Sequence, residues 1–141
     1  MPAHRSYDVD MRMITLVDDD EGVREATANL LRSLGYEVRT FESGRALLDW
    51  TGLNETSCVI TDIMMPEIDG FELHRRLASG GYRFPIIFLT ARTDAVAEAR
   101  MRECQVHCIL TKPCSERHLL DCVRSALGSG PADPCAGPTI S

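Results

Sequence analysis

The chain has 141 residues, 44% of them hydrophobic and 26% charged, with a formal net charge of -6 at pH 7. This length suits one domain with a full core and is too short for two ordinary domains. The acidic balance provides no basic field for a nucleic-acid backbone, so we expect no direct DNA binding. With no secretory leader and no apolar run long enough to span a membrane, we expect a cytoplasmic protein without a membrane segment.

The first part of the chain, 1-11, is polar and aperiodic, and we expect a disordered lead-in with Met11 or Met13 as alternative starts. An apolar run over 13–17 then predicts a buried parallel strand. Three acids follow it, and either Asp19 or Asp20 can cap a helix whose apolar spacing runs on to Gly35.

The rest of the chain alternates strand and helix. We expect a less buried strand over 36–41, a helix over 43–50, a strand over 58–61, a helix over 69–79, the most hydrophobic strand over 85–90, a helix from the Asp94 cap to 104, a strand over 106–110 and a helix over 115–127. This alternation predicts an α/β fold, a doubly wound five-stranded parallel sheet with five helices. The domain should cover 12-128, followed by a disordered tail over 129-141.

Polar side chains interrupt the apolar runs at the carboxyl ends of four predicted strands. They are Asp18 and Asp19 after the first strand, Asp62 after the third, Thr90 after the fourth and Lys112 after the fifth. Ligands of doubly wound sheets bind at this edge, where the strand order reverses. We therefore expect these side chains to form one site.

The chemistry of such a site follows from its charges. Three carboxylates repel one another, and Mg2+ (or Mn2+) with oxygen ligands is a natural counterion. Lys112 is the only lysine of the chain, and together with the Thr90 hydroxyl it could neutralise phosphoryl oxygens. We expect Asp62 to be a nucleophile that forms an aspartyl-phosphate.

Four motifs carry a resemblance to a known family. They are Val17-Asp18-Asp19-Asp20-Glu21, the stretch from Asp62 to Gly70 with its Met-Met-Pro turn, Leu89-Thr90-Ala91 and Thr111-Lys112-Pro113. In this order and spacing the chain resembles the receiver domain of two-component response regulators, here a stand-alone one. The resemblance implies a flavodoxin-like fold with strand order 2-1-3-4-5.

The resemblance also implies a role for each site residue. Asp62 would be the phosphoacceptor, taking the phosphoryl group from a phosphohistidine. Asp19, Asp62 and the Met64 backbone carbonyl would bind the metal, and Asp18 would hold it through water. Asp20 is a competitor for a place in the acidic pair that aligns less well with the helix that follows.

Two further roles lie on the loops around these residues. Thr90 and Lys112 would contact the phosphoryl oxygens as the switch pair, with the Lys112–Pro113 bond in the cis form. We expect Met64 and Arg92, two residues beyond Asp62 and Thr90, to modulate hydrolysis of the aspartyl-phosphate.

The resemblance implies a phosphoprotein that is a switch in a phosphorelay and not an enzyme, because it would catalyse only its own phosphorylation and slow autodephosphorylation. Its partners would be a sensor histidine kinase or histidine phosphotransfer protein, a downstream protein, and in some systems a second copy in a phosphorylation-dependent homodimer. The signal would leave through a partner or through the face made by the fourth helix, fifth strand and fifth helix.

The chain departs from the family pattern on this output face. The aromatic switch residue three before the lysine is Ile109, Gln105-Val106 stands for a Gly-Ala pair, and Cys114 stands for an aromatic. Ile109 offers a smaller change than a swinging ring, so we expect the chemistry to be retained and the readout to differ.

The cysteines allow a second interpretation. We expect all six to be reduced thiols, because a domain with its own core and no export signal needs no disulfides. The alternative is a thiol or zinc sensor built from Cys104, His107, Cys108, Cys114, His118 and Cys122. A small phosphatase using Asp18 and Asp20 is a third reading that leaves Asp62 without a role.

Overall fold

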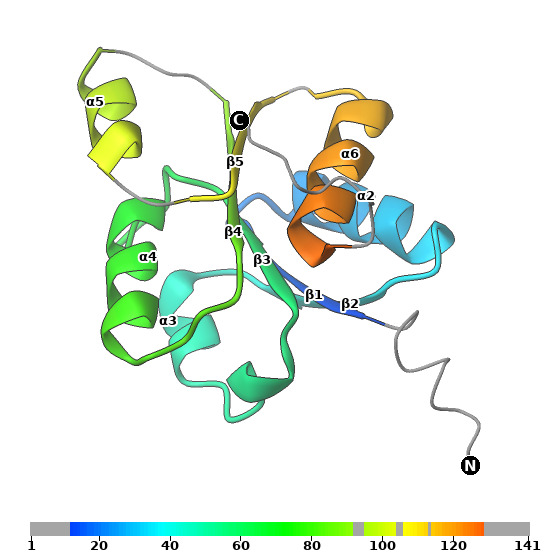
Figure 1. The fold of residues 1–141 in the computed structure, drawn as a ribbon, viewed down its shortest axis with the longest axis horizontal. Helices are drawn as coiled ribbons and strands as arrows, with labels where there is room; N and C mark the ends of the chain where they lie inside the picture. The colour runs from blue at the N-terminus through cyan, green and yellow to red at the C-terminus, as the bar shows by residue number, and fades with distance from the viewer. Residues whose placement is uncertain (1–11, 92–94, 104–105, 113, 129–141) are drawn as a thin grey trace.

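The computed structural model describes residues 12–91, 95–103, 106–112 and 114–128. A five-stranded parallel sheet lies at its centre, in the order β2-β1-β3-β4-β5 (Figure 1). The strands are β1 (Met13–Val17), β2 (Glu37–Phe41), β3 (Cys58–Thr61), β4 (Ile86–Thr90) and β5 (Cys108–Thr111). The order and the parallel pairing confirm the predicted doubly wound fold.

Helices cover both faces of the sheet. They are α2 (Glu21–Ser33), α3 (Gly44–Leu48), α4 (Gly70–Ser79), α5 (Ala95–Glu103) and α6 (Glu116–Leu127), with a short 3-10 helix, η1 (Leu53–Glu55), before β3. In Figure 1, α2 and α6 lie on one side of the sheet, and α3 and α4 on the other. Helix α5 meets α4 where the Arg100 guanidinium lies 4.1 Å from the centre of the Phe71 ring.

The pleat of the strands divides the core into two clusters. On β3, Cys58 and Ile60 join the cluster beneath α2 and α6, whereas Val59 joins the one beneath α3 and α4. On β4, Ile87 and Phe88 divide in the same way. Because both faces are covered, β1, β3 and β4 are buried throughout, which explains their continuous apolar runs.

The helix ends follow the signals in the sequence. The Asp20 side chain accepts a hydrogen bond from the Val23 N–H at 3.1 Å and caps α2, and Asp69 caps α4 in the same way. Gly35 and Gly128 follow α2 and α6 with φ of 100° and 70°, a left-handed conformation that glycine adopts without strain.

Two boundaries differ from prediction by two residues. Helix α3 ends at Leu48 instead of about Trp50, because the Trp50 ring turns to pack on Phe41 with ring centres 5.2 Å apart. Strand β5 begins at Cys108 instead of Val106, which packs against the cluster beneath α3 and α4. The predicted cap at Asp94 lies outside the described residues.

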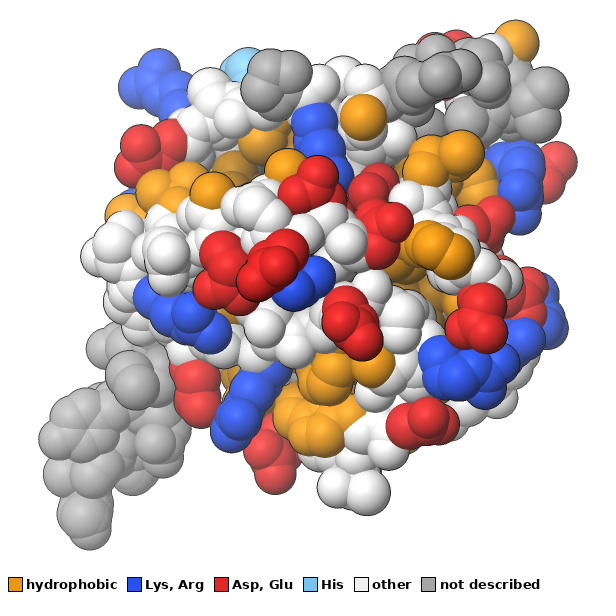
Figure 2. Space-filling model, turned by 180° about the vertical axis from the view of Figure 1, so that it is seen from behind, with side chains coloured by type: hydrophobic (Ala, Val, Ile, Leu, Met, Phe, Trp, Pro, Cys, Tyr) orange, Lys and Arg blue, Asp and Glu red, His pale blue; other side chains and the backbone are white. Residues whose placement is uncertain are grey.

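The surface carries charges of both signs. On the face seen in Figure 2, acidic side chains gather near the middle, with basic and hydrophobic side chains between and around them. No helix in the described part of the chain has the length and apolar character needed to cross a bilayer.

Candidate functional site

The site begins where β1 and β3 end. The Asp18 N–H donates to the Phe41 carbonyl at 3.1 Å, and the Asp62 N–H donates to the Val17 carbonyl at 3.0 Å. These bonds extend the ladders by one residue, so both aspartates leave the sheet in a fixed direction. Because β1 lies between β2 and β3, this edge is the switch point of the sheet, as the sequence predicted.

Three carboxylates meet at this edge. One oxygen each of Asp18, Asp19 and Asp62 lies within 4.8 Å of the other two, and no other group of three acidic, His or Cys ligands meets this criterion among the described residues. Asp18 and Asp62 are buried and Asp19 is exposed. Asp20 is not a member of the group, since its side chain caps α2 and its N–H donates to Asp18 Oδ1 at 2.9 Å.

Lys112 supplies the cation. Its Nζ donates to Asp18 Oδ2 at 2.8 Å and to Asp62 Oδ2 at 3.2 Å. Burial acts to lower the pKa of Lys112, but the hydrogen bond to Asp18 and the charges of both aspartates more than offset it, so the pKa is raised. The carboxylates still outnumber this ammonium three to one, and an all-oxygen set with excess negative charge fits a hard divalent cation.

Opposing effects act on the pKa of the Asp62 carboxyl group. Burial raises its pKa, Lys112 lowers it, the Asp18 charge raises it, and the Met64 N–H, 3.3 Å from Oδ1, lowers it. The net shift is upward. The fold therefore keeps an anion in a place where the negative charge is costly, and Lys112 is the main compensation.

The turn after Asp62 brings α4 back against it. Glu67 has a φ of 67°, and the Ile68 N–H donates to the Pro66 carbonyl at 2.7 Å. The helix starts at Gly70, where a Cβ atom would lie 2.7 Å from the Asp62 carbonyl oxygen. The glycine was visible in the sequence, whereas the left-handed glutamate was not anticipated, because no rule favours Glu at such a position.

Three of the remaining predicted residues fall in the described part of the chain. Thr90 is fully buried at the end of β4, and its carbonyl accepts a hydrogen bond from the Lys112 N–H at 2.6 Å. Met64, two residues after Asp62 in the connection from β3 to α4, leaves 66% of its surface exposed. Ile109 on β5 is 38% exposed. The predicted positions Arg92 and Pro113 lie outside the described residues.

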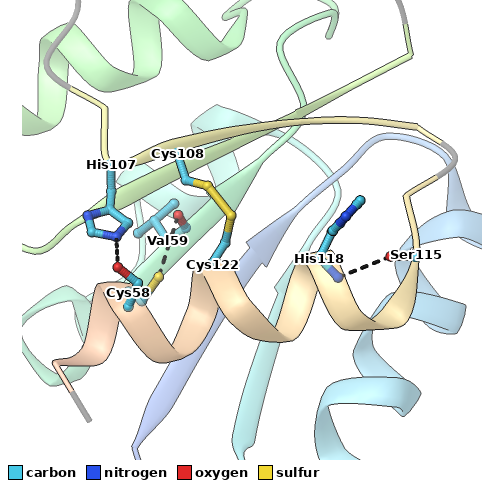
Figure 3. The surroundings of a disulfide bond; sticks show 8 residues. Cys58, Val59, His107, Cys108, Ser115, His118 and Cys122 are labelled. Atoms are coloured by element: carbon cyan, nitrogen blue, oxygen red, sulfur yellow. Dashed lines mark hydrogen bonds between the residues drawn. A yellow bond between two sulfur atoms is a disulfide. The ribbon is translucent and has the colours of Figure 1, made fainter. Parts of the chain in front are cut away.

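The cysteines correct one prediction. Cys108 on β5 and Cys122 on α6 form a disulfide, with their Cα atoms 6.3 Å apart (Figure 3), so the expectation of six reduced thiols is wrong for this pair. The reason is geometric: the strand start and the second turn of the helix lie side by side. Cys58 and Cys114 are free, while Cys104 and Cys135 fall outside the described residues.

The zinc-sensor alternative loses support for the same reason. Two of its six proposed ligands are joined to each other, and His107 pairs with Ser125, its Nε2 2.9 Å from the Ser125 Oγ. Within the described ranges, the carboxylate group is the arrangement that could hold a metal.

Comparison with known proteins agrees with this geometry. A family model described as "Response regulator receiver domain" matches residues 14–124. Response regulator protein TmoT of Ectopseudomonas mendocina is 36% identical over 129 residues, which cover 92% of this chain and 59% of that protein. Transcriptional regulatory protein TdiR of Thauera aromatica is 37% identical over 114 residues, covering 81% of this chain and 50% of that protein. The chain thus spans between half and three fifths of these relatives.

Solved structures give the same result. Chemotaxis protein CheY4 of Vibrio cholerae matches with a TM-score of 0.75 and 28% identity, over 83% of this chain and 99% of that one. A response regulator receiver protein from Burkholderia phymatum matches with a TM-score of 0.73 and 36% identity, over 83% of this chain and 95% of the other.

Proposed function

The chain belongs to the receiver-domain family of response regulators, and from this premise we propose that it is a phosphorylation switch with Asp62 as the phosphoacceptor. The observation that carries the proposal is the pair of hydrogen bonds from Lys112 to Asp18 and Asp62 at the switch point of the sheet. The donor would be a phosphohistidine of a sensor histidine kinase or a histidine phosphotransfer protein.

The transfer is a substitution at phosphorus. An Asp62 carboxylate oxygen bonds to the phosphorus atom, the P–N bond to the donor histidine breaks, and the imidazole leaves with the electron pair and takes up a proton. Asp62 must be ionised to attack, and Lys112 opposes the effect of burial that would protonate it. Lys112 and the Thr90 hydroxyl then neutralise oxygens of the bound phosphoryl group.

Asp18, Asp19, Asp62 and the Met64 carbonyl would hold Mg2+ or Mn2+, which when bound supplies positive charge to the phosphoryl oxygens. The support is the donor set, in which the oxygens of three carboxylates lie within 4.8 Å of one another. In the metal-free protein, Lys112 reduces the repulsion among these carboxylates, since it contacts two of the three side chains.

The output is a change of state at the α5–β5–α6 face, read by a downstream protein. We propose a cytoplasmic signalling role without direct DNA contact by this domain and without turnover of other substrates, apart from slow loss of its own phosphoryl group. Met64, an exposed residue two positions after Asp62, would influence that loss, and Arg92 is a second candidate on sequence grounds. A phosphorylation-dependent homodimer is one form that the readout could take.

A labelling experiment tests the acceptor. The purified chain is incubated with Mg2+ and acetyl phosphate, and intact-protein mass spectrometry should show the addition of one phosphate. Asp62→Asn should abolish the addition, because the amide is not a nucleophile. Chelation of the metal should suppress it in the unmodified chain.

Asp20→Asn is the matched control. It removes one carboxylate from the same acidic run, yet asparagine caps a helix as well as aspartate does, so labelling should persist. Retained labelling in Asp62→Asn, or its loss in Asp20→Asn with the fold intact, would contradict the assignment.

A further inference from the structure

The disulfide joins two elements of the proposed output face. Cys108 opens the edge strand β5 and Cys122 lies in α6, and both side chains are half-buried (Figure 3). Each packs against the core cluster that contains Leu119 and Val123. Those apolar contacts do not depend on the sulfur–sulfur bond, so the bond can open without removing the packing between strand and helix.

The bond closes a ring that includes β5 and Lys112, which follows the strand. The two cysteines are 14 positions apart, and the segment between them contains Ile109, Lys112 and the whole connection from β5 to α6. Lys112 reaches from this ring to Asp18 and Asp62. The disulfide therefore restricts the movement of this segment. A change at the phosphoryl site would have to pass through the same segment to reach the α5–β5–α6 face.

The other described cysteines do not compete for this bond. Thiol–disulfide exchange needs a thiolate, and burial raises the pKa of Cys58 to about 12. Burial also raises the pKa of Cys114. Both are poor nucleophiles, so neither thiol readily attacks the Cys108–Cys122 disulfide. Among the described residues, exchange of this disulfide is therefore expected with an external thiol.

We propose that Cys108 and Cys122 form a reversible redox site that responds to a low-molecular-weight thiol/disulfide couple and, when oxidised, clamps β5 to α6. The cytoplasm proposed above keeps thiols reduced, and a disulfide in such a compartment is usually transient or redox-sensing. Cys108 and Cys122 are half-buried residues at the edge of the cluster and leave part of their surface open to a small thiol, unlike the fully buried Cys58. This adds a second input, independent of phosphorylation.

The exchange balances with glutathione as the co-reactant. The thiolate of one cysteine attacks a sulfur of glutathione disulfide and releases one glutathione; the second thiolate then displaces the other glutathione from the mixed disulfide. The pair loses two electrons and two protons, and one glutathione disulfide becomes two thiols. Reduction is the reverse sequence.

The test is a redox titration of the full 141-residue chain. The protein is equilibrated without oxygen in buffers of varied reduced and oxidised glutathione, free thiols are trapped by alkylation, and peptide mass spectrometry gives the state of each cysteine. We expect Cys108 and Cys122 to convert together, with the ratio of oxidised to reduced protein proportional to the glutathione disulfide concentration divided by the square of the reduced glutathione concentration. Hydrogen exchange at 109–112 should be several-fold slower in the oxidised form.

Cys114→Ser is the matched control, since it removes a free thiol inside the ring and should leave both readouts unchanged. Cys108→Ser and Cys122→Ser should each abolish the glutathione dependence of hydrogen exchange. Cysteines that stay reduced in every buffer, or a bond that persists in the most reducing one, would overturn the proposal. No phosphoryl donor is used, so neither result bears on Asp62.

Discussion

Two regions of the molecule are held in place differently. One is the site at the carboxyl ends of β1 and β3; the other is the margin of the sheet, formed by β5 and α6. Every residue of β1 and β3 is buried, and the residues that follow them, Asp18 and Asp62, are tied to neighbouring strands by backbone hydrogen bonds. On β5 only Leu110 is buried, and a disulfide and a His107–Ser125 hydrogen bond attach the strand to α6. The first region is packed on both faces, whereas β5 is held by its ladder with β4, by the buried Leu110 and by these discrete contacts with α6.

Under the proposed function, this difference separates the chemistry from the readout. Packing on two faces leaves few alternative arrangements at the site, which suits groups that would hold a phosphoryl group and a metal in one geometry. A half-exposed edge strand has a lower cost of movement and can pass between two states. Lys112 belongs to both regions, because it follows β5 and contacts the aspartates after β1 and β3.

Truncation of an isoleucine to alanine in each region tests this difference in packing most directly. Ile60→Ala on β3 should lower the free energy of unfolding by about 3 to 4 kcal/mol, because a fully buried side chain leaves a cavity. Ile109→Ala on β5 should cost less than about 1 kcal/mol, since 38% of that residue is already exposed. Urea unfolding measures both, and equal costs would show that the margin is packed as tightly as the centre.

The residue that joins the regions should have the next largest effect. Lys112→Met leaves Asp18 and Asp62 buried without their cation and should cost about 3 kcal/mol in the presence of EDTA. Saturating Mg2+ should close much of the gap to the unmodified chain, because a second cation then offsets the same carboxylates. Arg75→Met, which breaks an exposed ion pair with Glu72, is the surface control and should leave the urea midpoint nearly unchanged. A gap that Mg2+ does not change would contradict the shared role of Lys112 and the metal.

The packed region is also the one that the sequence predicts well. Buried parallel strands have continuous apolar runs, so a polar residue such as Asp62 or Thr90 at the end of a run is conspicuous. The Asp, Ser and Gly residues at the helix ends were equally informative, since each satisfies backbone groups in a known way. The strand order came from the family resemblance, and the parallel pairing agrees with it.

The margin was predicted less well for physical reasons. The start of β5 was placed two residues early, because an edge strand with mixed burial has no clean apolar period. The Cys108–Cys122 bond was missed, since pairing depends on which strand and helix lie side by side, and spacing alone does not decide this. The left-handed Glu67 in the turn after Asp62 was missed because a positive φ is uncommon for glutamate, so the residue type gives no signal for it.

A third change tests how closely the packed region is fitted. In Gly70→Ala the new methyl group would lie 2.7 Å from the Asp62 carbonyl oxygen and 2.8 Å from Ile63 Cα, both backbone atoms. We expect a loss of about 2 kcal/mol and slower labelling by acetyl phosphate, because Asp62 must shift. In Gly22→Ala on α2 the nearest atom would be 3.5 Å away, so this control should gain about 0.5 kcal/mol. If Gly70→Ala left the free energy of unfolding and the labelling rate unchanged, the turn after Asp62 could shift at little cost.

The smallest effect concerns the charge of Asp62 itself. Burial raises the pKa of this carboxyl above its ordinary value of 3.8, so the folded state binds the proton more readily than the unfolded chain. The contribution of the group to stability is fully present below pH 3.8 and is lost as the pH rises through the folded-state pKa. Asp62→Asn carries no charge, so in EDTA it should gain stability relative to the unmodified chain as the pH rises.

The measurement is the difference in urea midpoint between the two proteins from pH 4 to pH 8. The difference should grow in favour of Asp62→Asn and then level off once Asp62 is fully ionised in both states. Added Mg2+ should reverse the trend, because the metal binds the carboxylate and not the amide. A pH-independent difference in EDTA would mean that Lys112 compensates the Asp62 charge completely, and the packed site would then carry its anion at no cost to stability.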